Sequence, residues 1–348
     1  MKRMQFRRHA SIAALSFGAA ALLASLAVCC ADTLYVSNWS GNTIEEFTAD
    51  GVGSVFASAG LSNPNGLAFD STGNLYVANG DSTIKKFTTA GVGSVFASIA
   101  SGGQRGLAFD TAGNLYFANF NNNTIEKFTT AGDGSVFAST GLNNPAGLAF
   151  DSAGNLYAAN YGGNTIEKFT TAGDGSVFAS TGLSGPTGLA FDGAGNLYVS
   201  NWSGNTIQKF TTAGVGSRFA STGLNQPFGL AFDSAGNLYV ANSGNNTIQK
   251  FTMAGVGSRF ANTGLSSPSF IAIRPGLAVP VYLSARQSGS ELILSWPTNA
   301  AGFTLQSTLN LTFPATWIDS TNAPATVGAQ FTVTNTIVGS GQFYRLKK

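Results

Sequence analysis

The residues best suited to bind a ligand are aromatic, and they recur at one position of a repeated sequence motif. In each copy a short apolar segment ends in Asn, and the residue after this Asn varies while its surroundings stay constant. In chain order the residue is Trp39, Gly80, Phe120, Tyr161, Trp202 and Ser243. Aromatic side chains on exposed loops stack on sugar rings or pack against protein partners. We therefore expect Trp39, Phe120, Tyr161 and Trp202 to form an aromatic arc that binds a ligand, unless each ring only packs on the neighbouring loop.

A second position varies in the same way, directly before a constant Gly. Its occupants are Asn65, Arg105, Ala146, Thr187, Phe228 and Ser269. We expect these residues to form a mostly uncharged inner collar beside the aromatic arc. Asn65, Arg105, Thr187 and Phe228 complete the set of residues predicted to bind the ligand.

Catalysis by a thiolate or an imidazole is excluded for most of the chain. The 2 Cys residues and the 1 His all lie among the first 30 residues, as His9, Cys29 and Cys30. Ser and Thr residues without an imidazole do not make a nucleophilic site. An enzyme is therefore disfavoured, and no catalytic residue is predicted.

The elements that must position these residues are short strands. A Leu-Tyr pair marks each repeat, beginning at Leu34, Leu75, Leu115, Leu156, Leu197 and Leu238, which gives steps of 40 or 41 residues. Within a repeat, four apolar segments of three to six residues are separated by Gly, Asn, Asp or Pro. Such a pattern predicts four-stranded sheets that cover one another's faces around an axis. The recurring Asp-x-x-Gly-Asn between the first two strands is typical of a turn rather than a metal site.

The strand count predicts how the ring closes. The full Gly-Leu-Ala-Phe-Asp strand occurs five times, and its sixth, degenerate copy is 270–273, near the end of the repeats. The first repeat, in contrast, begins directly with Leu34 and lacks this strand. We therefore predict an all-β, six-bladed β-propeller over residues 32–275, closed by pairing of the N-terminal strands with the C-terminal inner strand.

These repeats resemble a known family. The string Pro-x-Gly-Leu-Ala-Phe-Asp-x-x-Gly-Asn-Leu-Tyr-Val-Ala-Asn, followed by Asn-Thr-Ile-x-Lys-Phe, is similar to the NHL repeat. The resemblance implies a binding or interaction scaffold. Related gluconolactonase-type propellers hold a divalent metal with Glu, Asn and Asp, and only Asn65 matches one of these positions. A Ca²⁺ site and a metal-assisted lactonase or a streptogramin-lyase-like activity therefore form the alternative, in which Asn65 is the weak metal candidate. The lyases of this kind depend on His.

Residues 1–31 are predicted to be a signal peptide, because a basic head precedes an apolar run that ends in small residues. A retained membrane anchor, a lipoprotein site at Cys29 and a twin-arginine signal are alternatives. Loss of the four basic leader residues leaves 14 Lys and Arg against 16 Asp and Glu, a net charge of about −2. We expect a secreted, periplasmic or cell-envelope protein that has no membrane span after cleavage. Its partner would be an extracellular protein or a glycan, and not a nucleic acid.

A second domain follows the repeats. Residues 276–280 are predicted to be a linker and residues 281–348 a small β-sandwich, similar to the fibronectin type III-like domains of secreted bacterial proteins. The expected strands are 291–296, 303–307, 315–319, 330–336 and 342–346, with Trp296 and Trp317 in the core. A purely structural envelope protein is a further alternative for the whole chain.

Overall fold

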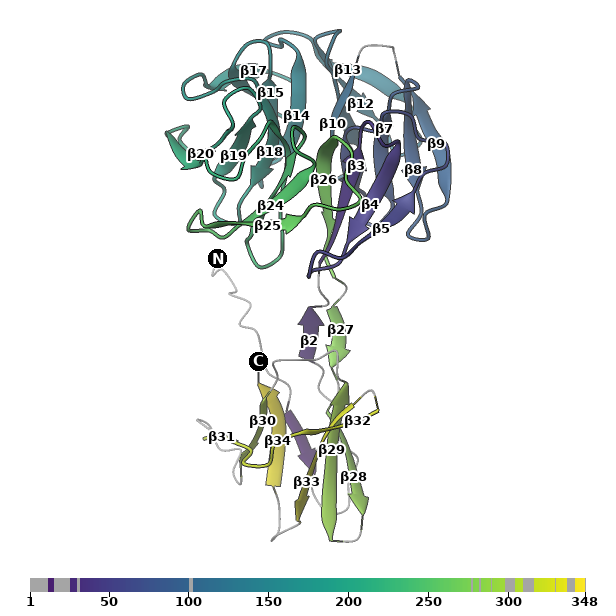
Figure 1. Cartoon of the computed structure of the whole chain (residues 1–348), viewed down its shortest axis with the longest axis vertical. Coiled ribbons are helices and arrows are strands. Elements are labelled where there is room, and N and C mark those ends of the chain that lie inside the picture. The colour runs from purple at the N-terminus through teal and green to yellow at the C-terminus, as the bar shows by residue number, and fades with distance from the viewer. Residues whose placement is uncertain are drawn as a thin grey trace. The chain divides into compact units, whose positions relative to one another are not determined.

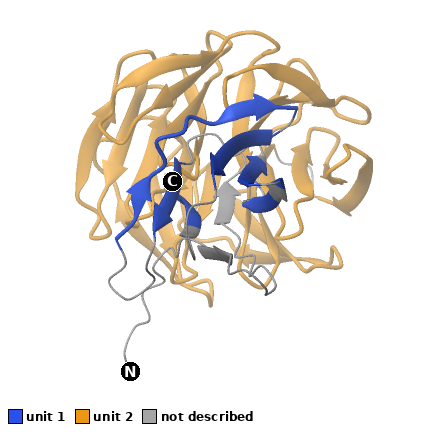
Figure 2. Ribbon diagram, turned by 90° about the horizontal axis from the view of Figure 1, so that it is seen from below, with its two compact units in different colours: residues 1–30, 276–348 blue, residues 31–275 orange. Residues whose placement is uncertain are grey.

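The computed structural model describes residues 12–15, 26–29, 32–99, 103–276, 278–281, 283–288, 290–297, 304–308, 316–328, 330–336 and 342–347. The chain divides into a unit of residues 31–275, orange in Figure 2, and a unit made of residues 1–30 and 276–348. The described residues contain strands and turns but no helix, so none of them forms a helix that could cross a membrane.

Residues 31–275 form the predicted six-bladed propeller, in which each blade is an antiparallel sheet of four strands (Figure 1). The innermost strands are β26 (Pro268–Arg274), β6 (Leu67–Phe69), β10 (Gln104–Phe109), β14 (Pro145–Phe150), β18 (Pro186–Phe191) and β22 (Pro227–Phe232), for blades 1 to 6 in turn. The second strands are β3 (Thr33–Asn38), β7 (Leu75–Asn79), β11 (Leu115–Asn119), β15 (Leu156–Asn160), β19 (Leu197–Asn201) and β23 (Leu238–Asn242).

The outer half of each blade is a second hairpin. The third strands are β4 (Thr43–Phe47), β8 (Thr83–Phe87), β12 (Thr124–Phe128), β16 (Thr165–Phe169), β20 (Thr206–Phe210) and β24 (Thr247–Phe251). The outermost strands are β5 (Gly53–Ala57), β9 (Gly93–Ser98), β13 (Gly134–Ala138), β17 (Gly175–Ala179), β21 (Gly216–Ala220) and β25 (Gly257–Ala261).

Blade 1 closes the ring as the strand count predicted. Its sheet has the order β26-β3-β4-β5, so its inner strand comes from the end of the repeats and its other strands from the start. The pairing is antiparallel, with Ile271 opposite Val36 and Ile273 opposite Leu34. Each of the other five blades consists of four consecutive strands. Joining the two ends of the repeat region in one sheet leaves no open edge between the first and last blades.

Aromatic residues hold neighbouring blades together. Tyr76 of β7 lies between Phe96 of its own blade and Phe109 of the next, and both ring centroids are 4.9 Å away in edge-to-face geometry. The same arrangement recurs around Tyr116 and Tyr157. Edge-to-face pairs add about 0.5–1.5 kcal/mol to the burial of apolar area. The constant residues of the repeat therefore stabilise the contacts between blades.

The recurring Asp residues form turns, as predicted. In blade 5, Asp192 Oδ1 accepts hydrogen bonds from the backbone amides of Ala194 and Asn196, and its Oδ2 accepts one from Asn196 Nδ2. Gly195 has a φ of 83°, which a residue with a side chain rarely adopts. Lys209 Nζ lies 3.7 Å from Asp192 Oδ2. The carboxylates are thus occupied by turn amides and a lysine.

The inner strands bring the collar residues to the axis. A Cβ atom on Gly188 would collide with the carbonyl oxygen of Phe228 on the next blade, and one on Gly66 would collide with that of Arg105. Glycine therefore permits the close approach of these strands. The register shifts between Pro186 and Leu189 of β18, and the corresponding shift recurs in β10, β14, β22 and β26. Each bulge contains a collar residue and redirects its side chain.

The second unit contains the two sheets of a β-sandwich. One has the order β28-β29-β33-β32 and the other β1-β34-β30-β31. The strands are β28 (Ser284–Ser288), β29 (Glu291–Pro297), β33 (Gln330–Thr336), β32 (Ala325–Val327), β1 (Ile12–Leu15), β34 (Gln342–Lys347), β30 (Thr304–Thr308) and β31 (Ile318–Asp319). Leu294, Trp296 and Val333 of the first sheet share a core with Leu305 and Tyr344 of the second.

Two sequence predictions for this unit need refinement. Trp296 is buried in the core, but Trp317 is only partly buried and packs beneath the guanidinium of Arg345, 4.3 Å from its ring centroid. The prediction that Trp317 lies in the core was wrong, because the residue type alone does not distinguish a core Trp from one that packs on a cationic side chain at the surface. The strand predicted over 315–319 is shorter than expected, because β31 contains only Ile318–Asp319. Residues 303 and 315, at the starts of two predicted strands, lie outside the described residues.

Two strands come from the segment predicted to be a signal peptide. β1 pairs with β34, and β2 (Leu26–Cys29) pairs with β27 (Ala278–Val281), which overlaps the predicted linker. Cleavage after Ala31 would remove β1 and β2 from these pairings. Cleavage itself stays a prediction.

Candidate functional site

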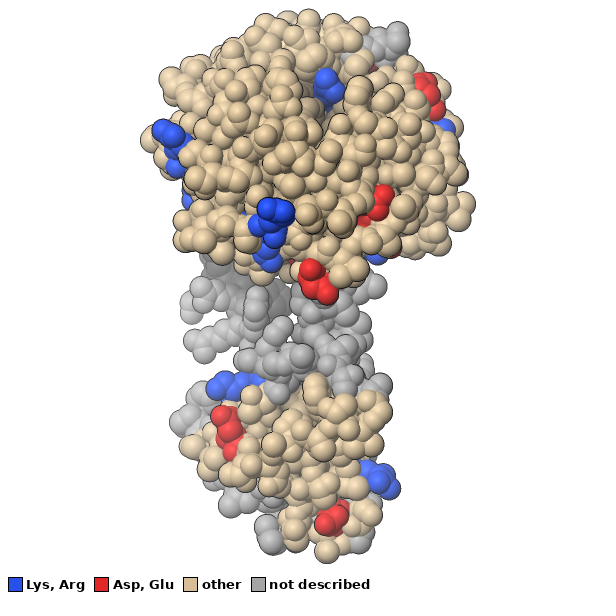
Figure 3. Space-filling model, viewed as in Figure 1, with Lys and Arg blue, Asp and Glu red and all other residues tan. Residues whose placement is uncertain are grey.

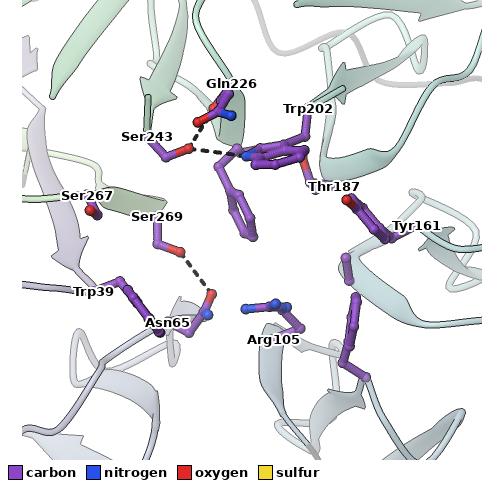
Figure 4. Close-up of a pocket in the computed structure, with 13 residues that line it drawn as sticks. Trp39, Asn65, Arg105, Tyr161, Thr187, Trp202, Gln226, Ser243, Ser267 and Ser269 are labelled. Carbon is purple, nitrogen blue, oxygen red and sulfur yellow. Dashed lines mark hydrogen bonds between the residues drawn. The ribbon is translucent and has the colours of Figure 1, made fainter. Parts of the chain in front are cut away.

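A cavity of about 430 Å³ opens at one mouth of the propeller, where the loops after the second strands meet the starts of the inner strands. All six blades contribute residues to its walls, which are shown in Figure 4. Blade 2 contributes only Asn65, and the loop after its second strand does not line the cavity. The lining residues are Trp39, Asn65, Arg105, Phe120, Ala146, Tyr161, Thr187, Trp202, Gln226, Phe228, Ser243, Ser267 and Ser269. All eight residues that the sequence predicted to bind a ligand are therefore brought together in one cavity.

Three aromatic side chains form a continuous wall across blades 3, 4 and 5. The ring centroids of Phe120 and Tyr161 are 5.8 Å apart, and those of Tyr161 and Trp202 are 6.1 Å apart. Trp202 Nε1 donates a hydrogen bond of 3.3 Å to Ser243 Oγ on blade 6. The aromatics thus pack on neighbouring loops and line the cavity at once, so the two sequence-based interpretations of the arc are compatible.

Trp39 belongs to the cavity wall but not to this continuous stack. Its side chain is 46% exposed, the largest exposed fraction among the arc residues. Its backbone amide donates to the carbonyl of Ser267, which fixes the loop of blade 1 against the end of the repeat region. The exposed indole is consequently available to a ligand without first breaking a contact with another ring.

Arg105 is the one charged residue among those that line the cavity. Its guanidinium carbon lies 4.6 Å from the ring centroid of Phe120 and 5.6 Å from that of Phe228. Its Nε is buried and has no hydrogen-bond partner among the described residues. Burial lowers the pKa of Arg105 from its usual range because desolvation disfavours the cation. Two aromatic faces therefore hold an uncompensated cation at the channel mouth.

Asn65 is the neighbour of Arg105 in the collar, on blade 2. Its Oδ1 accepts a hydrogen bond of 3.0 Å from Ser269 Oγ, and its carbonyl accepts one of 2.6 Å from Ser37 Oγ. The bond from Ser37 holds the backbone, and the bond from Ser269 orients the side-chain amide so that Nδ2 is its remaining donor. In Figure 4 the end of Arg105 is directed toward Asn65.

The donor set around Asn65 does not fit a divalent metal. Ca²⁺ takes six to eight oxygen ligands, among which carboxylates are prominent. The cavity lining has no Asp or Glu, and the Asn65 oxygen is already engaged by Ser269. No cluster of three His, Cys, Asp or Glu side chains suited to a metal occurs among the described residues. The described side chains around Asn65 therefore do not provide the ligands of a divalent metal.

Thr187 and Ser200 form a hydroxyl pair on blade 5, with their oxygens 2.9 Å apart. Thr187 Oγ1 also donates to the carbonyl of Pro227 at 3.2 Å on the next blade. Both hydroxyls are buried, and their hydrogen bonds join the inner strands of adjacent blades. Thr187 therefore stabilises the contact between blades 5 and 6 in addition to lining the cavity.

Sequence reasoning did not select Gln226, Ser243, Ser267, Ser269 or Ala146 as binding residues, although the structure places them in the lining. Gln226 and Ser267 precede a Pro and have positive φ values of 47° and 48°. Their position also varies between repeats, so it carried a signal that could have found them. The other three occupy the two variable positions already identified.

The Asn residues that end the second strands do not line the cavity. Asn201 is buried, and its Nδ2 donates to the carbonyl of Gly182 at 2.9 Å and to Thr206 Oγ1 at 3.0 Å. Its Oδ1 accepts the backbone amide of Ser184. Corresponding bonds are made by Asn38, Asn79, Asn160 and Asn242 and connect the loop that leads into the inner strand with the end of the second strand. Asn119 differs, because its Nδ2 donates to Glu126 Oε1.

The model of the virginiamycin B lyase family matches residues 19–287, which is most of the chain and the whole propeller. This chain belongs to the virginiamycin B lyase family. No curated protein matches it at a significant level. The more specific assignment to NHL repeats, and the fibronectin type III-like assignment of the tail, stay predictions.

Solved structures of virginiamycin B lyase family members share the propeller fold. A streptogramin B lyase superposes with a TM-score of 0.56 at 17% identity, covering 74% of this chain and 95% of that one. Virginiamycin B lyase from Staphylococcus aureus gives 0.56 at 18% identity, covering 78% and 95%. A catalytically inactive histidine-to-alanine variant of the latter, with quinupristin, gives 0.54 at 17% identity, covering 79% and 96%. At these identities the likeness establishes the fold alone.

This member of the virginiamycin B lyase family lacks an imidazole in its propeller. Its single histidine is His9, which lies outside the described residues and outside residues 31–275. At the mouth of the propeller the chain instead has aromatic rings, hydroxyls, amides and Arg105.

Proposed function

We propose that the propeller binds a small ring-containing ligand in the mouth cavity. The observation that carries this proposal is the convergence of Trp39, Phe120, Tyr161 and Trp202 on one concave space of about 430 Å³. Ligand sites in proteins are typically clefts of about 300–1,000 Å³ with aromatic walls and a few polar groups. Membership of the virginiamycin B lyase family supports a small-molecule site on this fold.

A carbohydrate suits the cavity better than the surface of an extracellular protein. A pyranose ring presents a face of C–H groups that packs on an indole, while its hydroxyls pair with Ser, Thr and Gln side chains such as Ser267 and Gln226. A concave space admits one or two sugar rings, whereas protein interfaces usually bury about 800 Å² per partner over a broader surface. Export from the cytoplasm is part of this proposal and follows from the predicted leader.

The test is a titration of the full chain with a panel of mono- and oligosaccharides and with quinupristin, in which binding is measured by tryptophan fluorescence and by calorimetry. We expect saturable binding of at least one ring-containing ligand that weakens at least tenfold in Trp202→Ala. Trp317→Ala is the matched control, because this Trp belongs to the other unit. Undiminished binding by Trp202→Ala and Trp39→Ala would refute the assignment to this cavity.

Turnover by a lyase or a lactonase is the second proposal, and the family match is the observation that favours it. The cavity lining has neither a carboxylate nor an imidazole to remove a proton. Mass spectrometry separates the outcomes, since ring opening of a cyclic ester by elimination leaves its mass unchanged while hydrolysis adds one water. Binding of quinupristin or a lactone without product is the expected result, and either product would assign an enzymatic function.

A further inference from the structure

We propose that the mouth cavity selects ring-shaped ligands that carry a carboxylate, such as uronic sugars, and that Arg105 and Asn65 bind this group. The inference rests on the proposed function, because it specifies the charge of the ligand in the same cavity.

The first argument is the charge of the site. Arg105 is the only ionised side chain in the lining, and no described carboxylate lies within ion-pair distance of it. Lys86, Lys127, Lys168 and Lys209 of the propeller, in contrast, each lie near an Asp. A cation that is partly removed from water without a counter-ion is unfavourable. An anionic ligand supplies the missing charge, and a neutral one does not.

The second argument is the geometry of the donors. Phe120 and Phe228 contact the guanidinium through their rings and leave its N–H groups without acceptors in the described structure. Ser269 engages the oxygen of Asn65, and within the described part of the chain no acceptor is bonded to the Asn65 amide nitrogen. The N–H groups of Arg105 on blade 3 and the amide nitrogen of Asn65 on blade 2 are thus donors in the same cavity. The fork of N–H groups on Arg matches the two oxygens of a carboxylate.

The third argument is the position of these donors relative to the aromatic wall. Phe120 contacts both Arg105 and Tyr161, so the cation lies directly beside the rings on which a sugar stacks. A ligand that stacks on Tyr161 or Trp202 and extends a carboxylate toward the axis meets Arg105 and Asn65. Hexuronic acids combine a stacking ring with a carboxylate on an exocyclic carbon, and they satisfy both requirements.

The test compares galacturonate and glucuronate, as monomers and short oligomers, with galactose, glucose and the uronate methyl esters. We expect the acids to bind at least tenfold more tightly than their neutral counterparts, with an affinity that falls as NaCl is raised. Arg105→Gln should lower acid affinity by about tenfold to a hundredfold, the range for hydrogen bonds to charged groups, and lower the affinity for neutral sugars by a clearly smaller factor. Arg218→Gln, which alters an exposed arginine of β21, is the matched control.

Arg105→Lys retains the charge without the planar fork, so it should recover part of the preference for acids. Such a recovery would show that the loss in Arg105→Gln comes from the missing charge and not from misfolding. Equal affinity of acids and neutral sugars, unchanged acid binding in Arg105→Gln, or an equal loss of acid and neutral binding in that variant would overturn the inference while the proposed function stands. Equally tight binding of galactose 6-sulfate would replace the carboxylate site by a general anion site. Absence of binding by every ring-containing ligand would overturn both proposals.

Discussion

The guanidinium of Arg105 lies over the ring of Phe120, with 4.6 Å between the guanidinium carbon and the ring centroid. Both residues belong to blade 3, where Arg105 comes from the inner strand and Phe120 from the loop after the second strand. This contact joins the collar to the aromatic arc. It therefore couples the charged part of the cavity to the part on which a ring stacks.

The first prediction concerns this coupling. Phe120→Leu removes the cation–π contact and the ring contact with Tyr161, so it should lower the free energy of unfolding by about 1–2 kcal/mol. In the Arg105→Gln background the same substitution should cost about 0.5–1 kcal/mol less, because the cation–π part is already lost. Urea unfolding of the wild type, the two single variants and the double variant measures the coupling energy between Phe120 and Arg105. Strictly additive costs would show that the two side chains do not interact.

The second prediction separates packing from ligand contact in the aromatic arc. Trp202→Ala should destabilise the propeller by about 2–4 kcal/mol, because the indole packs on Tyr161 and bonds to Ser243. Trp39→Ala should change stability by less than about 0.5 kcal/mol, because this indole is 46% exposed. Thermal unfolding of both variants tests the contrast. A large loss in Trp39→Ala would mean that this residue is structural.

The third prediction concerns the buried amides at the ends of the second strands. Asn201→Ala should cost about 2–4 kcal/mol, because it leaves the carbonyl of Gly182 and the amide of Ser184 without their partner. It should also loosen the loop that carries Trp202. Denaturant unfolding and hydrogen exchange of residues 182–188 report the two effects. Ser203→Ala on the same loop is a suitable control, and a comparable loss there would contradict the role assigned to Asn201.

The fourth prediction uses a charge reversal in blade 1. The other blades place a Lys of the third strand near the turn Asp, as in Lys209 and Asp192. Blade 1 has Glu46 and Arg274 at these two positions, and Arg274 lies over Tyr35 at 5.1 Å. Each of Glu46→Lys and Arg274→Asp should lower stability by about 1 kcal/mol through like charges, and the double variant should recover most of the loss. A loss in the double variant equal to the sum of the two single losses would refute an interaction.

The fifth prediction is acid destabilisation through the turn carboxylates. Burial alone would raise the pKa of Asp192, but hydrogen bonds from Asn196 and Ala194, with the nearby Lys209, outweigh it and lower the pKa. A lowered folded pKa gives stability that is present above the unfolded value of about 3.9 and is lost as the pH falls through the folded value. Asp192→Asn should therefore be less stable than the wild type at neutral pH.

The stability difference between wild type and Asp192→Asn should shrink as the pH falls below about 4. Unfolding titrations at several pH values measure it. Glu167 provides a contrast, because burial raises its pKa and its charged form opposes folding above the unfolded value. Glu167→Gln should accordingly gain, rather than lose, stability at neutral pH. A pH-independent difference for Asp192→Asn would contradict the assigned titration.

The sequence alone determined the number of blades, the closure of the ring and the two variable positions. These features follow from local rules: Gly-Asn turns require positive φ, alternating apolar residues require a sheet, and the missing first strand of the first repeat requires a partner from the last. Family membership agrees with the fold, although the sequence pattern pointed to NHL repeats.

Only the tertiary structure decided how the variable residues meet. Arg105 and Phe228 are more than a hundred residues apart, and their contact depends on the inner strands of different blades converging on one axis. Likewise, Ser269 of β26 reaches Asn65 of blade 2 only because β26, from the end of the repeats, pairs with β3 and becomes the inner strand of blade 1. Such contacts join residues from separate repeats, and a pattern within one repeat does not encode them. The repeat thus predicts where each side chain lies in its blade, while closure of the ring decides which side chains share a cavity.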